Sequence, residues 1–253
     1  MNQIKWILLL VFPAILLPAC TSSKSIQRQM LGIESELFYV LTTPFYSENI
    51  EHTIYLNPVC DSTALPYSIV KKKGFLFIPL LVYNSMRRSF EVTLGNTSLI
   101  QTYPDFLVDA LLAECNRSSC FDLIVKEELV VPDSAMILEV KVNKNTTTTK
   151  LVSSGGLFLN PFMDWQFEGF SNWKVSRPVN NLEIAVRLMQ HGNYLFEKTY
   201  TVVHTSENQQ SNIEEAFNAY TNCIDEMTFC LSQTTKRVVE DISRDLHLLI
   251  LGL

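Results

Sequence analysis

Apolar and polar residues alternate along several segments of the chain with the two-residue period of a β-strand. Met136–Val142 reads "MILEVKV", with Glu139 and Lys141 between apolar neighbours, and Leu182–Met189 reads "LEIAVRLM". Because successive side chains of a strand point to opposite faces, both segments predict strands with one buried and one solvated face. Thr146–Val152 is polar and β-prone, which predicts a partner strand that faces water.

Apolar runs and one turn predict the remaining strands. Phe75–Tyr83, "FLFIPLLVY", is a continuous apolar run typical of a strand buried on both faces, and Pro79 inside it indicates an edge position or a bulge. The sequence His-Gly-Asn at 191–193 predicts a hairpin turn, after which Tyr194–Val203 returns as a strand. Shorter strands are predicted at Thr53–Leu56, Phe90–Leu94 and Phe121–Val125.

Two segments have the period of a helix. Tyr103–Cys115 has an early proline and an acidic residue in its first turn, as expected of a helix N-terminus. From Asn212 onward, with Ser211 or Asn212 as the expected cap, apolar positions step by three and four. These positions are Phe217, Tyr220, Ile224, Met227, Leu231, Thr234, Val238, Ile242 and Leu246. They predict one long amphipathic helix, or two helices joined by a kink, packed across a sheet, and the length also permits a coiled coil and a homodimer through this helix.

This order of elements predicts an α+β fold. We expect a single domain in which helices pack on one face of a mixed, mostly antiparallel sheet, with the long amphipathic helix at the C-terminus. A hydrophobic content of 47% supports a sizeable core. The net charge is −6, and the densest basic run, Lys71 to Lys73, stands beside an apolar strand. The sequence therefore predicts no basic patch and no nucleic-acid partner.

The N-terminus has the pattern of a secretory signal. Lys5 is the only charge before the apolar run Trp6–Leu17, which is shorter than the roughly 20 residues of a membrane span. The run ends in "LPAC", which resembles the lipobox of bacterial lipoproteins. The resemblance implies cleavage after residue 19 and lipidation of Cys20. The alternative is a plain secretory signal with a chance cysteine.

A lipobox implies a location as well as a modification. No Asp follows Cys20, which by analogy with lipoprotein sorting indicates the outer membrane, with the protein facing the periplasm. Several acyl chains on one residue give stable anchoring. The expected organisation is a signal peptide at 1–19, a polar lipidated tether at 20–29 and a periplasmic α+β domain at 30–253.

Five cysteines remain after Cys20. Cys115 and Cys120 flank a polar turn and are candidates for a disulfide that closes a small loop. Cys223 and Cys230 are two helical turns apart, about 10 Å, which is too far for a bridge. The sequence leaves open whether Cys60 pairs with one of them. No ligand set with the usual spacing predicts a metal site.

The series of segments resembles a known family. "FLFIPLLVYN", "YPDFLVDALLAE", "CFDLIV", a strand, a glycine-bearing apolar insert, a hairpin ending in "LFEKTYTV" and a final helix follow one another from Gly74 to Leu246. This series resembles ABC-type transport auxiliary lipoproteins and, more distantly, lipoprotein activators of penicillin-binding proteins. The resemblance implies a mixed sheet crossed by the last helix, and an envelope protein as partner.

An aromatic stretch between residues 154 and 173 fits neither a strand period nor a helix period. Its aromatic residues are Phe158, Phe162, Trp165, Phe167, Phe170 and Trp173. Aromatic side chains dominate binding hot spots, so we expect these six residues to contact a partner or a membrane. The alternative is that the stretch covers a sheet edge and completes the core.

Residues for catalysis are scarce in the sequence. None of the four histidines lies in a known catalytic or metal-binding motif, and no cofactor, catalytic residue or metal is predicted. The predicted function is that of a non-enzymatic accessory protein of an envelope complex, in transport or in cell-wall metabolism. One alternative is a carrier of lipid or another apolar ligand, with Leu157–Trp173 lining a groove. A second is a cell-wall hydrolase that uses Asp164 or Glu168.

Overall fold

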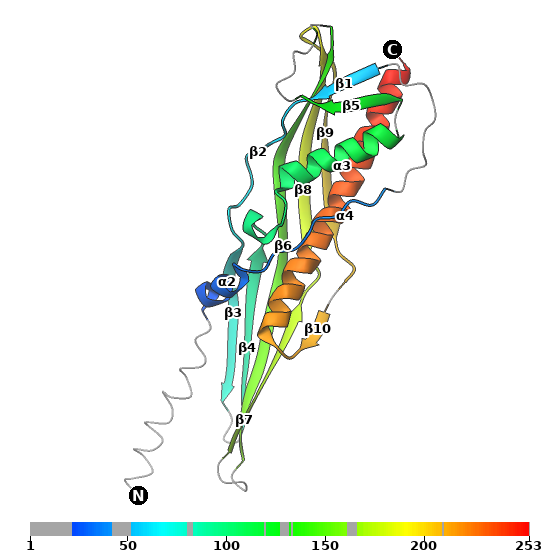
Figure 1. Cartoon of the computed structure of the whole chain (residues 1–253). Coiled ribbons are helices and arrows are strands. Elements are labelled where there is room, and N and C mark those ends of the chain that lie inside the picture. Colours follow the sequence, from blue (N-terminus) through cyan, green and yellow to red (C-terminus); the bar gives the residue numbers. More distant parts are fainter. Residues whose placement is uncertain are drawn as a thin grey trace, which may run out of the picture.

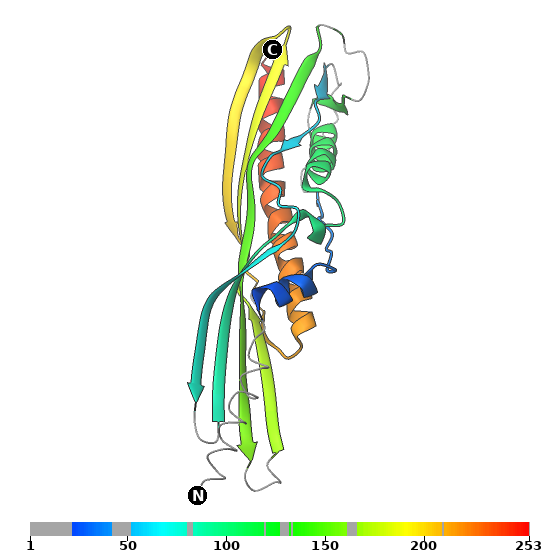
Figure 2. The same cartoon turned by 90° about the vertical axis from the view of Figure 1, so that its left-hand side faces the viewer.

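The computed structural model describes residues 22–41, 52–79, 83–118, 120–126, 132, 134–160, 166–208 and 210–252; for a few of them, mainly at strand ends, it describes the backbone alone. The elements, in chain order, are α2 (Ser23–Met30), β1 (His52–Leu56), β2 (Cys60–Asp61), β3 (Ile69–Pro79), β4 (Tyr83–Thr93), the 3₁₀ helix η2 (Asn96–Ser98), α3 (Tyr103–Ser118), β5 (Phe121–Val125), β6 (Met136–Asn160), β7 (Gln166–Val175), β8 (Val179–Gln190), β9 (Asn193–Thr205), β10 (Gln210–Ile213) and α4 (Ala216–Leu251). The predicted α+β fold is confirmed, with one open mixed sheet, helices on one of its faces and a long C-terminal helix (Figures 1 and 2).

Strand β6 connects the two halves of the sheet, because it pairs with strands of both halves. Its first half pairs antiparallel with β8 and parallel with β1 and β2, and its second half pairs antiparallel with β4 and β7. The segments that the sequence predicts as two strands, Met136–Val142 and Thr146–Val152, are therefore one strand. A register shift between Val142 and Lys144 in the pairing with β8 marks where the polar residues interrupt the alternation.

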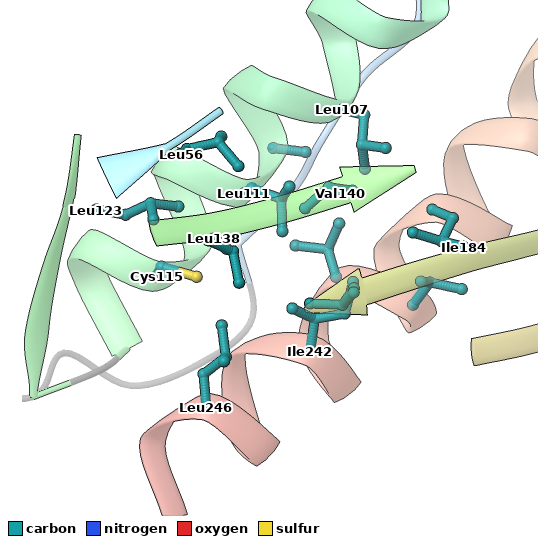
Figure 3. Packing of buried hydrophobic residues seen from close by; sticks show 14 of the residues in the cluster. Leu56, Leu107, Leu111, Cys115, Leu123, Leu138, Val140, Ile184, Ile242 and Leu246 are labelled. Atoms are coloured by element: carbon teal, nitrogen blue, oxygen red, sulfur yellow. The ribbon is translucent and has the colours of Figure 1, made fainter. Parts of the chain in front are cut away.

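The larger core cluster lies where α3 and α4 cover the first half of β6. Figure 3 shows Leu107 and Leu111 of α3 and Ile242 of α4 around Val140 of β6 and Ile184 of β8. All five side chains are at most 3% exposed. The periodicity of the predicted helices and of "LEIAVRLM" arises here, because each of these segments buries one face only.

The smaller core cluster contains Ile26, a residue that we expected in the polar tether at 20–29. Ile26 and Met30 of α2 are buried against Phe90 of β4 and Leu151 of β6. The predicted tether at 20–29 is therefore wrong from Ser23 onward. The two apolar residues are four positions apart and share one helix face, and Ser22 caps the helix by accepting a hydrogen bond from the Ser25 amide (3.2 Å).

Two other local expectations differ from the structure. The predicted strand Phe75–Tyr83 is the end of β3 and the beginning of β4, and Phe75 and Leu76 are about half exposed rather than buried on both faces. The expected edge position of Pro79 is confirmed, because β3 pairs with β4 alone. The N-cap of helix α4 is Glu215, not residue 211 or 212 as expected. An N-cap residue usually has an extended backbone, whereas Asn212 has a positive φ of 63°.

The second half of the sheet extends beyond the helices. In Figure 2, α2, α3 and α4 lie on one side of the sheet, and β3, β4, β6 and β7 continue past α2 and the first turn of α4. We call this extension the blade: residues 74–79, 83–89, 153–160 and 166–172 of these four strands. The rest of the domain is called the body. The C-terminus lies at the far end of the body from the blade (Figure 1).

Candidate functional site

The blade is an antiparallel sheet in which chain segments far apart in sequence lie side by side. One row across it joins Phe75 to Arg88, Arg88 to Ser153 and Ser153 to Trp173. The next row toward the tip begins with Leu76 and Arg87 and continues through residues 154 and 172. Neighbouring rows point to opposite faces of the sheet, so the first row faces the side of the helices and the second faces away from them.

The face away from the helices is basic. Arg87, Lys150 and Lys174 line an open hollow of about 490 Å³ together with Gly74 and Leu76. A second hollow adjoins it through shared Lys150 and Ser176, and adds Arg177. All four cationic side chains are exposed. We call Arg87, Lys150, Lys174 and Arg177 the cationic face.

Acidic residues hardly offset the charge of the cationic face. Among the described residues that line the two hollows, Glu91 is the single acid, and its carboxylate forms an ion pair with Lys73 (3.1 Å). The expectation that the chain forms no basic patch is therefore wrong for this face. The four cations come from three strands and the connection after β7, so no window of the sequence contains them, and only the strand register brings them together.

Trp173 closes the core at the base of the blade. Its side chain is 6% exposed, and its ring meets the ring of Tyr220 of α4 edge to face, with centroids 5.4 Å apart at 78°. Burial raises the pKa of the Tyr220 phenol, against an opposing effect of nearby Arg88. The prediction that Trp173 contacts a partner or a membrane is wrong, because this residue is the part of the aromatic stretch that completes the core.

The other aromatic residues of the stretch belong to the blade or lie outside the described residues. The backbones of Phe158, Phe167 and Phe170 are in β6 and β7, where Phe158 pairs with Glu168 and Phe170 pairs with Gly156. Phe162 and Trp165 lie outside the described residues, as do Asp164 and the lipidation candidate Cys20. A contact of these five aromatic residues with a partner or a membrane stays a prediction.

The predicted disulfide between Cys115 and Cys120 is absent. None of the five cysteines that the structure describes is bridged. Cys115 is buried on the inner face of α3, where its thiol is hydrogen-bonded to Ser243 of α4 and packs beside Leu138 and Leu246 (Figure 3). Its side chain therefore points into the core instead of across the turn to Cys120.

These cysteines differ sharply in reactivity, which gives a testable prediction. Burial raises the pKa of the Cys115 and Cys223 thiols to about 12, whereas Cys60 is exposed on the body. Because the thiolate is the reactive form, we expect maleimide to modify Cys60 alone in the folded protein and all five thiols in urea, as counted by mass spectrometry. A protein in which Cys115 and Cys120 resist modification even in urea would contradict the absence of their disulfide.

Other functional classes find little support in the geometry. Among the residues that the structure describes, no group of three or more His, Cys, Asp or Glu residues is placed to hold a metal ion. The described backbone of the segment Leu157–Trp173 lies in strands β6 and β7, with Glu168 in β7. Throughout the described part of the chain, no helix combines the length and the apolarity needed to cross a membrane.

A distant structural neighbour of the chain exists among solved protein structures. No family model matches the chain, and no curated protein matches it. The crystal structure of protein XCC0632 from Xanthomonas campestris, described as family-model DUF330, is similar with a TM-score of 0.48 and 10% sequence identity. The match covers 86% of this chain and 96% of that one. At this distance the function has to be argued from the residues of this chain.

Proposed function

We propose that the protein is a lipoprotein of the outer membrane that faces the periplasm and serves as a non-enzymatic accessory of an envelope complex, in transport or in cell-wall metabolism. The observation that carries the proposal is the blade, a sheet that extends past the described helices and away from the packed core. Such an element offers an extended surface for docking instead of a cleft for a substrate.

The position of α2 supports the anchor. The capping residue Ser22 follows Cys20 by two positions, and α2 is fixed to the body by buried Ile26 and Met30. An extended chain gains at most about 3.5 Å per residue, so a lipid on Cys20 holds the domain within about 7 Å of the membrane surface at this point. A protein held so closely is suited to act on neighbours in the same membrane.

The anchor has a direct test. In cells, we expect the wild-type chain to sediment with the outer membrane, and its N-terminal peptide to begin at Cys20 with the mass of a triacylated cysteine. Cys20→Ala removes the acceptor sulfur, so this variant should keep residues 1–19 and be lost from the outer-membrane fraction. Thr21→Ala is the matched control and should behave as the wild type. An unmodified Cys20 in the wild type would overturn the proposed anchor.

The accessory role is tested separately, by crosslinking in cells. A photoreactive residue at Leu76 on the blade should capture a defined envelope protein, and the same residue at Tyr194, on the β8–β9 turn at the other end of the body, serves as the matched control. Capture should require the anchor and should therefore be lost with Cys20→Ala. A lipidated protein that captures no envelope protein from either position would count against the accessory role.

A further inference from the structure

We propose that the blade is a second membrane contact, in which its apolar end enters the interface of the anchoring bilayer and the cationic face lies against anionic phospholipid headgroups. The inference rests on the proposed anchor at Cys20 and adds to it an orientation and a lipid preference. It commits to one occupant of the exposed blade, a phospholipid surface. A protein partner or a second copy of the chain at the same place is an outcome that the test can reveal.

The distances bring the blade to the membrane. Val70 of β3 packs in the same core cluster as Ile26 and Met30 of α2, and β3 continues to Pro79. At roughly 3.3 Å per residue these nine steps span about 30 Å, whereas the chain from Cys20 to Ser22 reaches about 7 Å at most. The end of β3 therefore lies several times farther from the α2 contact than the tether can reach. An anchored domain that lies along the membrane, or tilts its blade toward it, brings the blade into the bilayer surface.

The composition of the blade suits such a surface. Residues 75–83 carry no charge, and the outward side chains of Phe75 and Leu76 are 48% and 55% exposed. The blade segments 153–160 and 166–172 contribute Phe158, Phe167 and Phe170 and contain a single acid, Glu168. Aromatic and apolar side chains are favoured at the boundary between headgroups and acyl chains. Adjacent exposed apolar side chains, such as those of Phe75 and Leu76, are typical of a surface that contacts a membrane or another protein.

The cationic face supplies the complementary charge. Lys150 and Lys174 lie two rows apart, on the same face, at the base of the blade, with Arg87 toward the tip and Arg177 toward the body. The net charge of the chain is −6, so this local excess of positive charge runs against the average of the molecule. Basic side chains near a bilayer are attracted by anionic lipids. On β3, the uncharged residues Phe75–Pro79 begin directly beyond the row that contains Lys174, so apolar residues adjoin the cationic face on the side of the tip.

The open edges of the blade limit how deeply it enters. Among the described residues, β3 has no partner strand on the side away from β4, and β10 pairs with positions 173 and 175 of β7 but not with residues 166–172. Unpaired backbone N–H and C=O groups are not tolerated in hydrocarbon without partners. The blade therefore stops in the hydrated interface, where water satisfies these groups, and does not span the bilayer.

Depth-dependent fluorescence quenching tests the inference on the full lipidated chain. An environment-sensitive dye is attached at position 76 in Leu76→Cys with Cys60→Ser, and the control dye is attached to native Cys60 on the body. The buried thiols stay unlabelled. The protein is reconstituted into phosphatidylethanolamine vesicles with or without phosphatidylglycerol, and a quencher is placed on the acyl chains. We expect at least a halving of the emission at position 76 and no loss at Cys60.

Flotation of the same samples separates this inference from the anchor. Quenching at position 76 supports the blade contact, and it does so even in Cys20→Ala, which has neither a lipid nor a thiol for the dye at position 20. Flotation without quenching at position 76 overturns the blade contact and leaves the anchor intact; the exposed blade would then belong to a protein partner or a second copy. Loss of both flotation and quenching overturns both proposals.

Charge reversal tests the cationic face. Lys150→Glu with Lys174→Glu should reduce the quenching at position 76 at least twofold on vesicles that contain phosphatidylglycerol, and change it little on vesicles without it. Lys141→Glu with Lys144→Glu, two exposed lysines on the body part of the same strand β6, makes the same change in charge away from the hollows and should have no effect. Equal effects of the two double variants would overturn the role assigned to the cationic face.

Discussion

Replacing Trp173 by alanine is expected to lower the free energy of unfolding by about 3–5 kcal/mol, the usual cost of truncating a buried aromatic side chain. The indole is 6% exposed and forms an edge-to-face contact with Tyr220, so its removal leaves a void between β7 and α4. For a domain of this size each kcal/mol corresponds to roughly 2–4 °C. The melting temperature should therefore fall by about 10 °C, as measured by circular dichroism.

Matched variants show whether the loss comes from packing. Trp173→Phe keeps an aromatic ring against Tyr220 and should lose less than half as much stability as the alanine variant. Leu76→Ala removes an apolar side chain from the same sheet at a position that is 55% exposed, and should change the free energy of unfolding by about 0.5 kcal/mol or less. If Trp173→Ala left the melting temperature unchanged, its side chain would not be part of the core.

This contrast separates Trp173 from the other aromatic residues of the stretch. Trp173 lies at the base of the blade and stabilises the domain, so its replacement says nothing about binding unless stability is measured beside it. Phe167 and Phe170 lie further along β7, where that strand is an edge of the blade. A variant intended to probe binding should therefore change the blade and spare position 173.

The elements that the sequence predicts correctly are those that bury one face against the body. "LEIAVRLM" alternates because Leu182, Ile184, Val186 and Leu188 all point into the core from β8. The period of α4 is visible for the same reason, since its inner face covers the sheet over its whole length. One-sided burial leaves a periodic pattern in the sequence, and that pattern can be read without knowing the partner strands.

The expectations that fail concern contacts between distant segments. An apolar run such as Phe75–Tyr83 has the same composition whether it is buried on both faces or extends uncovered from the domain, so its sequence does not reveal the blade. The cationic face depends on cross-strand register, which no single segment specifies. The sequence does not predict the short helix α2, because most of its residues are polar. The spacing of Ile26 and Met30 is the weak signal of this helix.

A close approach between two chain segments sets the conformation of the connection after β4. Gly95 follows this strand, and its amide donates to the Ser68 hydroxyl (2.9 Å). The next two amides, at 96 and 97, donate to the carbonyls of Leu65 and Pro66 (2.8 and 3.1 Å). The φ of Gly95 is −126°, which other residues adopt freely, so space and not backbone conformation favours glycine here.

Gly95→Ala is accordingly expected to destabilise the protein by about 3 kcal/mol, the upper range for overpacking a tight site. An added Cβ would lie 2.1 Å from the carbonyl carbon of Tyr67 and 2.4 Å from the Ser68 nitrogen, and backbone atoms cannot move aside as a flexible side chain can. Gly32→Ala is the matched control: its Cβ would meet nothing within 4 Å, so the free energy of unfolding should stay equal or rise slightly. Urea unfolding of the two variants checks the difference. Equal stability would mean that segment 65–68 can separate from the end of β4 at little cost, and the connection would then not fix the strand from which the blade extends.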